Sequence, residues 1–190
     1  SAASDVYKRQ IQASAHADDD FSKAGSIAEL TDWNIYSPLW APVTLDGKWL
    51  RLQDKDPFDY AKVERKIPAS KELKISFDLQ AGQNDKGTLQ IDFLDENIIA
   101  CSRLELTPDG IFRAKGGSRF GNLMKYEPGK NYHVEAILSV TDRNIQVFVD
   151  GKRVGLRMFY APVSAIERIA FRTGVPRTFP TVDTPADQTY

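Results

Sequence analysis

Apolar and polar residues alternate with a period of two over most of the chain after Trp40. In one such run Leu73, Ile75 and Phe77 alternate with lysine, serine and aspartate. A period of two places successive side chains on opposite faces of a β-strand, so that one face enters a core. Helical spacing fits these runs less well. The strands predicted in this way include 73–80, 89–93, 133–140, 145–149 and 169–171.

Turn signals separate the predicted strands. Asp-Gly pairs at 46–47, 109–110 and 150–151 suit tight hairpins, and 127–130 (Glu-Pro-Gly-Lys) is a further turn. Residues 18–32 hold the only helix-like stretch, too short to connect parallel strands. We therefore predict an all-β fold, an antiparallel sandwich of two sheets of the jelly-roll type.

The hairpin near residue 142 can be given a register. With 141–144 as its loop, Val140 pairs with Ile145, and Ile137 lies opposite Phe148. This apolar pair then falls on the polar face of the sheet. Either another segment covers the pair, or the pair lies in a ligand groove.

The two ends of the chain differ from its middle. Residues 1–17 lack the strand pattern, and the first ten resemble a translated sequencing-adapter tail; a natural N-terminus is the alternative. Residues 176–190 are rich in proline and threonine, which is typical of a linker. We expect a sandwich domain over 18–175, followed by a linker to a further C-terminal domain. The alternative for this end is a plain tail.

Composition narrows the classes of function. The 190 residues carry 25 basic and 26 acidic side chains, a net charge of −1, which gives no reason to expect nucleic acid as a partner. No apolar run is long enough for a transmembrane helix. Cys101 is the one cysteine, so the chain has no disulfide framework and no cysteine metal cluster.

Three segments carry a family resemblance: 50–61 (with Asp-Lys-Asp-Pro-Phe-Asp-Tyr-Ala), 148–152 (Phe-Val-Asp-Gly-Lys) and 166–174. Together they resemble the concanavalin A-like, laminin-G-like jelly-roll domains of bacterial glycan-processing proteins, over about residues 20–175. The resemblance implies an accessory domain of a larger secreted or periplasmic enzyme. A catalytic domain of the same parent chain, and a polysaccharide, are the partners it implies.

Catalytic motifs of enzymes with this fold are missing from the sequence. No glutamate begins the Glu-x-Asp-x-x-Glu pattern of laminarinase-type glycosidases. The run 90–92 lacks the histidine of the jelly-roll alginate lyases, and 126–130 is a turn rather than their tyrosine-rich strand. His133 is expected on the polar face of its strand, without a second histidine nearby.

Three aspartates, Asp54, Asp56 and Asp59, surround Pro57. Closely spaced carboxylates in a loop can bind a hard cation, and calcium is the cofactor this arrangement suggests. The same residues suit a turn in which aspartate accepts backbone N–H bonds. Contact with another domain is a third interpretation.

Aromatic residues gather in the first third of the chain. Tyr36, Trp40 and Tyr60 are candidates for stacking on sugar rings, although tryptophan and tyrosine in a sandwich also serve as core. We expect Trp40 or Tyr36 to be more exposed than Trp49.

Arg168 and Arg172 are predicted on one face of a strand, where two guanidinium groups can hold a uronate or a sulfate. They can equally form a salt-bridge ladder with outward residues of other strands, or contact a neighbouring domain. Those outward residues are Asp78, Gln90 and Asp92.

Three hypotheses of function follow. The first is a non-catalytic accessory domain that docks to a catalytic domain, binds carbohydrate, or does both. The second is a divergent jelly-roll hydrolase or lyase, whose site requires Asp78, Gln90, Asp92, Arg168 and Arg172 on one surface. The third is a structural or adhesive domain without a small ligand, favoured by an apolar outer patch at Ile137 and Phe148.

Overall fold

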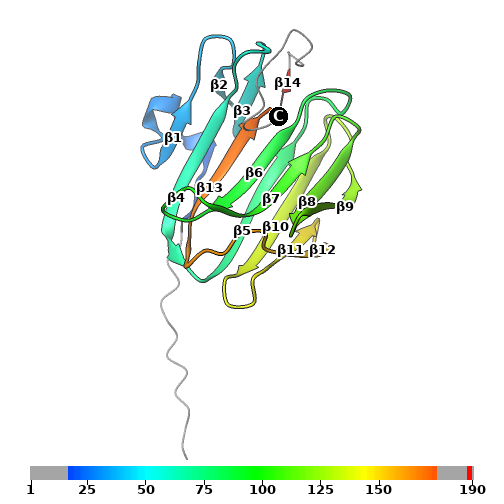
Figure 1. The fold of residues 1–190 in the computed structure, drawn as a ribbon. Helices are drawn as coiled ribbons and strands as arrows, with labels where there is room; N and C mark the ends of the chain where they lie inside the picture. Colours follow the sequence, from blue (N-terminus) through cyan, green and yellow to red (C-terminus); the bar gives the residue numbers. More distant parts are fainter. Residues whose placement is uncertain (1–16, 175–187, 190) are drawn as a thin grey trace, which may run out of the picture.

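Strands dominate the computed structural model, which describes residues 17–174 and 188–189 (Figure 1). Within these residues the helical elements are two 3-10 turns, η1 (Phe21–Lys23) and η2 (Ile27–Glu29). Asp20 precedes η1 and accepts a hydrogen bond from the Ser22 N–H at 3.1 Å, which satisfies a donor at the start of the turn. The all-β prediction is confirmed.

Two antiparallel sheets form the sandwich, and their strands lie one behind the other in Figure 1. The larger sheet has seven strands in the order β1-β4-β13-β6-β7-β8-β9, and the smaller has four in the order β12-β11-β10-β5. The seven-stranded sheet comprises β1 (Trp33–Tyr36), β4 (Lys62–Ser70), β6 (Leu89–Leu94), β7 (Ala100–Leu106), β8 (Ile111–Gly116), β9 (Arg119–Lys125) and β13 (Ile166–Thr173). The four-stranded sheet comprises β5 (Glu72–Gln80), β10 (Asn131–Ser139), β11 (Asn144–Val149) and β12 (Lys152–Met158).

A small third sheet, β14-β3-β2, contains β2 (Val43–Asp46), β3 (Trp49–Asp54) and β14 (Gln188–Thr189). Gln188 pairs with Asp54, and Thr189 pairs with Gln53. The described part of the predicted linker is therefore paired with β3. The remainder of that linker, and the predicted N-terminal segment up to residue 16, lie outside the described residues.

The core lies between the two larger sheets. Ile91 and Phe93 of β6 are fully buried, as are Ala136 and Leu138 of β10, in agreement with the alternation of both strands. Each large apolar side chain buried in this way stabilises the fold by about 1.5–3 kcal/mol. Cys101 is also fully buried, and burial raises the pKa of its thiol to about 12.

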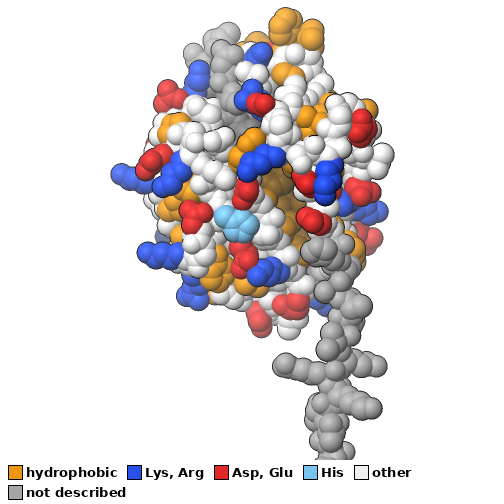
Figure 2. All heavy atoms as spheres, turned by 180° about the vertical axis from the view of Figure 1, so that it is seen from behind, with side chains coloured by type: hydrophobic (Ala, Val, Ile, Leu, Met, Phe, Trp, Pro, Cys, Tyr) orange, Lys and Arg blue, Asp and Glu red, His pale blue; other side chains and the backbone are white. Residues whose placement is uncertain are grey.

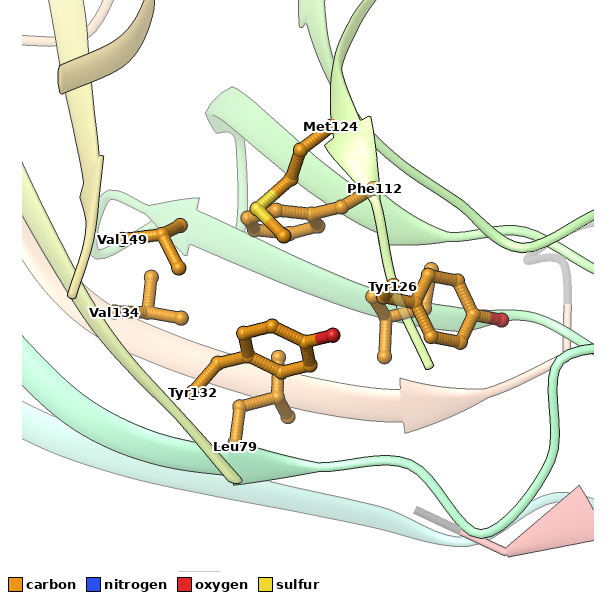
Figure 3. Close-up of a pocket in the computed structure, with 8 residues that line it drawn as sticks. Leu79, Phe112, Met124, Tyr126, Tyr132, Val134 and Val149 are labelled. Atoms are coloured by element: carbon orange, nitrogen blue, oxygen red, sulfur yellow. The ribbon is translucent and has the colours of Figure 1, made fainter. Parts of the chain in front are cut away.

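One internal cavity shows how tightly the sheets pack. Its volume is about 10 Å³, room for no more than a single water. The lining is apolar and comes from both sheets, with Phe112 and Met124 facing Leu79, Val134 and Val149 (Figure 3). This cavity is part of the core and is too small for a ligand.

The β10–β11 hairpin differs from the predicted register. Leu138 pairs with Ile145, and Ser139 pairs with Asn144, so the loop is 140–143 rather than 141–144. Both loops have four residues, and in the observed one Arg143 adopts a positive φ of 54°, which is uncommon outside glycine. A shift of two residues keeps every side chain on its predicted face. However, Phe148 now lies opposite Glu135, so the predicted Ile137–Phe148 pair is wrong.

Candidate functional site

The outer surface of the seven-stranded sheet carries most of the chain's partly buried charged residues. On β6, Gln90 and Asp92 alternate with the core residues, and they face away from the four-stranded sheet. Neighbouring strands place polar residues in register with them: Asp92 pairs with Arg103, and Gln90 pairs with Glu105. We call this surface the polar face; its side chains are Glu64, Gln90, Asp92, Arg103, Glu105, Arg113, Arg168 and Arg172.

The middle of the polar face is held by charged hydrogen bonds. Asp92 accepts two bonds from Arg103, from Nε at 2.6 Å and from Nη2 at 3.0 Å. Burial works against the charge of Arg103, but these bonds outweigh it and raise its pKa. Glu105 is buried and accepts from Gln90 Nε2 at 2.6 Å and from Arg113 Nε at 2.8 Å. The carboxylates of Asp92 and Glu105 are thus already paired within the sheet.

Arg168 is also paired. Its Nη1 donates to Glu64 Oε1 at 2.7 Å, and Lys62 Nζ donates to Glu64 Oε2 at 2.8 Å. Burial tends to raise the pKa of Glu64, but the two cationic donors hold it below its usual value. The salt-bridge interpretation therefore describes Arg168 better than the ligand interpretation.

Arg172, four residues further along β13, has a different environment. Its guanidinium lies over the ring of Tyr60, with Cζ 3.9 Å from the ring centroid. Arg172 makes no ion pair with any carboxylate among the described residues, and its buried Nε has no hydrogen-bond partner there. Burial lowers the pKa of Arg172, although a guanidinium remains charged at neutral pH. Arg172 is thus a cation held by an aromatic ring, next to the hydrogen-bonded charged residues of the polar face.

Tyr60 in turn contacts Tyr36, with ring centroids 4.8 Å apart and planes inclined at 37°. The Tyr36 hydroxyl donates to Asp59 Oδ1 at 3.1 Å, and this bond raises the pKa of Tyr36. The structure therefore brings together three of the five residues predicted to bind carbohydrate: Tyr36, Tyr60 and Arg172.

Exposed apolar residues flank these three. Trp40 is 60% exposed and Phe58 is 63% exposed, whereas Trp49 is half-buried, as expected from the sequence. Trp40 and Phe58 lie on two loops that a hydrogen bond from Lys55 N to Trp40 O joins at 2.8 Å. We call Tyr36, Trp40, Phe58 and Tyr60 the aromatic rim. The sequence analysis missed Phe58, although a phenylalanine inside an Asp-Pro-Phe-Asp turn, away from any strand, is a signal for an exposed ring.

The family model described as Sialidase-like, CBM domain matches residues 33–188. The chain belongs to this family. The Sialidase-like, CBM domain family places the protein among carbohydrate-binding modules, and it agrees with the predicted jelly-roll domain of a glycan-processing protein.

Solved structures agree with this assignment. A protein titled "Sialidase" is 85% identical, with a TM-score of 0.85 over 93% of this chain and 16% of its own. The chain therefore spans about a sixth of that sialidase. The carbohydrate-binding module CBM66 from Bacillus subtilis is 12% identical (TM-score 0.50, covering 83% of this chain and 89% of that one). An endo-1,3-beta-glucanase from Streptomyces sioyaensis is 14% identical (TM-score 0.58, covering 93% and 92%).

At such low identity the last two show the fold alone. No curated protein sequence matches the chain.

In this sialidase-like CBM domain, the three loop aspartates serve the turn. Asp54 is buried and accepts from Asp56 N at 3.2 Å and from Thr173 Oγ1 at 3.1 Å. Asp56 Oδ1 accepts from Phe58 N at 2.8 Å, and Asp59 Oδ1 accepts from Tyr60 N at 2.9 Å. Among the described residues no group of three acidic, histidine or cysteine side chains converges as metal ligands do. These hydrogen bonds are the ones expected if the three aspartates stabilise a turn. Calcium binding stays a prediction.

The residues predicted for a hydrolase or lyase site are divided between two surfaces. Asp78 lies on β5 of the four-stranded sheet, where its Oδ1 is 2.9 Å from His133 Nδ1. Gln90, Asp92 and the two arginines lie on the polar face of the other sheet. The hypothesis required all five on one surface, so this CBM-family domain does not assemble the predicted catalytic set.

The opposite end of the polar face also carries cation–aromatic contacts, which the sequence analysis missed. Arg113 lies over Phe120 and Lys115 lies over Tyr160, each 4.2 Å from the ring centroid.

No helix within 17–174 is long and apolar enough to cross a membrane.

Proposed function

We propose that this domain is a non-catalytic carbohydrate-binding module that holds an acidic glycan between the aromatic rim and Arg172. The observation that carries the proposal is the Arg172–Tyr60 stack, because it offers a cation that is not ion-paired with any carboxylate in the described part of the chain, beside exposed rings. Aromatic faces pack against the C–H surfaces of sugars, and a guanidinium binds a carboxylate or a sulfate through parallel N–H bonds.

The acidic sugar is a uronate, a sulfated sugar or a sialic acid. All three carry an anion that a guanidinium recognises, and a sialic acid also fits the 85%-identical sialidase. Neutral glycans offer the rings a stacking surface but leave Arg172 without an anion, so we expect them to bind more weakly.

The domain acts as an accessory part of a larger secreted or periplasmic glycan-active protein. Its match to 16% of a sialidase supports a multidomain parent. In that parent the domain docks to the catalytic part and brings it to the glycan. The domain itself is non-catalytic in this proposal, because the carboxylates of the polar face are paired with arginine, lysine or glutamine side chains and are not free to act as acid and base.

Calorimetry on the 190-residue chain tests this function. Sialylated, uronate-rich, sulfated and neutral oligosaccharides are titrated with and without calcium, against the wild type, Arg172→Gln and the control Arg153→Gln. Arg153 is exposed on β12 of the other sheet, so its loss should leave affinity unchanged. We expect acidic oligosaccharides to bind and Arg172→Gln to weaken them about tenfold or more, the value of one charged hydrogen-bond pair.

Equal affinity of acidic and neutral oligosaccharides would contradict the role of Arg172. A folded chain that binds none of the four classes would contradict carbohydrate binding on this face. Cleavage of any of them would contradict the non-catalytic assignment.

A further inference from the structure

Among the described residues, strand β5 lies at one edge of the four-stranded sheet and pairs on one side only, with β10. The Val140 N–H donates to Lys71 O at 2.8 Å, and this bond fixes the phase of the β5–β10 ladder. In an antiparallel ladder every second residue bonds to the partner strand. Leu73, Ile75 and Phe77 therefore bond to β10, and the backbone N–H and C=O groups of Lys74, Ser76 and Asp78 point away from it.

A large cleft adjoins this edge. It has a volume of about 860 Å³ and is lined by residues 73–80 of β5, by the inner faces of β4 and β13, and by β3. Figure 2 views the molecule from this side and shows a hollow with hydrophobic side chains in it. The side chains at its base are half-buried where a closed sandwich would bury them: Trp33, Ile67, Leu73, Ile75, Phe77 and Phe171.

The chemistry of the cleft fits a polypeptide better than a sugar. Phe77 of β5 meets Phe171 of β13 edge to face, with centroids 5.2 Å apart, so the two sheets present a continuous apolar floor. Polar side chains such as Arg65, Lys74 and Asp78 also line the cleft. The feature that favours a polypeptide is the row of free backbone groups along the edge of β5, because an exposed strand edge recruits another strand.

We propose that this cleft is the docking site for an extended segment of the longer parent protein, which pairs with β5 as a fifth strand. Alternate apolar side chains of the segment would fill the hollow between Ile67, Phe77 and Phe171. The argument for an occupant within the parent is that the 85%-identical sialidase is about six times longer than the part this chain matches. The inference rests on the docking role proposed above, and it is independent of glycan binding.

Hydrogen exchange measured by mass spectrometry tests the strand. The 190-residue chain is compared alone and grafted into the 85%-identical sialidase in place of the matching stretch. In the graft, peptides from Glu72–Gln80 should exchange about tenfold more slowly at roughly half of their amides, since a docked strand protects the outward groups alone. Peptides from β12, the other edge of this sheet, serve as the internal control.

A pair of variants tests the apolar floor. Ile67→Lys places a charge in the cleft, and Met158→Lys places one on the last residue of β12, where Met158 is 51% exposed. Ile67→Lys should abolish the protection of β5 in the graft, and Met158→Lys should leave it unchanged, with equal thermal midpoints of the two isolated chains confirming that both fold.

Three outcomes would overturn the proposal. The first is unchanged exchange of β5 in the graft. The second is protection that appears in the isolated chain as its concentration rises, with a doubled mass in sedimentation, which would assign the edge to a second copy. The third is protection brought about by oligosaccharide alone. Loss of glycan binding in calorimetry would leave the β5 result intact, so the two proposals fail separately.

Discussion

The guanidinium of Arg172 lies 3.9 Å above the ring of Tyr60. Arg168, on the same face of the same strand, is instead bonded to Glu64. The difference follows from the neighbours that the fold supplies, because β4 brings Glu64 to Arg168 and the loop before β4 brings Tyr60 to Arg172. Arg168 is thus paired within the sheet, whereas Arg172, held over a ring, is the arginine that we propose for ligand binding.

Two substitutions of Tyr60 should separate the contribution of its aromatic ring to glycan binding from that of its hydroxyl group. Tyr60→Phe keeps the surface under Arg172, so affinity for acidic oligosaccharides should change little. Tyr60→Ala removes it and should cost about 1–2 kcal/mol of binding free energy, the range of a partly desolvated cation–π contact. Calorimetry on both variants checks this; equal losses in the two would show that the hydroxyl, rather than the ring, matters.

Asp54 should make the fold less stable as pH rises. Burial raises the pKa of Asp54 from 3.8 to about 6, so between these pH values the folded state holds more protons than the unfolded state. The free energy of unfolding should therefore fall by about 2–3 kcal/mol from pH 4 to pH 6.5 through this group. Asp54→Asn should remove that slope, whereas the control Asp56→Asn should keep it. Urea unfolding at several pH values is the measurement, and parallel slopes for wild type and Asp54→Asn would refute the assignment.

Glu64 should show the opposite dependence on pH. Its folded pKa is held below the usual value by Lys62 and Arg168, so its contribution is present above about pH 4.5 and is lost as pH falls through the folded pKa. Glu64→Gln should destabilise the domain by about 2–3 kcal/mol at pH 7, because it leaves Arg168 without its carboxylate. The penalty should shrink in acid.

The matched control for Glu64 is Glu135→Gln, which breaks the more exposed pair with Lys74 and should cost less than about 1 kcal/mol. Equal losses in the two variants would mean that burial of the Glu64 cluster adds nothing.

Calcium offers a test of the loop around Pro57. Because backbone and hydroxyl groups already donate to all three aspartates, we expect calcium or a chelator to move the thermal midpoint by less than about 1 °C. Differential scanning fluorimetry checks this, with Asp59→Asn as the comparison. A calcium-dependent rise of several degrees that Asp59→Asn removes would establish the metal site instead.

Much of the fold could be predicted because the alternation of apolar and polar residues in a strand can be seen directly in the sequence. The inward faces of β5 and β10 follow directly from their sequences. The hairpin register could not be predicted, because nothing in the sequence marks Arg143 for a positive φ. The sheet order places β13 between β4 and β6, and this depends on contacts between residues far apart in the chain.

The candidate site was predicted only in part for the same reason. Trp40 and Tyr36 could be expected to be exposed, since neither lies in a regular apolar alternation. The different roles of Arg168 and Arg172 could not, because both have the same position in the pattern of their strand. Their environments come from Glu64 and Tyr60, more than a hundred residues away in the sequence.

The buried Cys101 has a practical consequence. A thiol with no exposed surface and a pKa of about 12 stays protonated and out of reach of alkylating reagents at neutral pH. Since the chain has no other cysteine, Leu39→Cys, at a position 79% exposed beside Trp40, would carry the sole reactive sulfur. An environment-sensitive dye attached there would report the arrival of a glycan at the aromatic rim without any change to the native core.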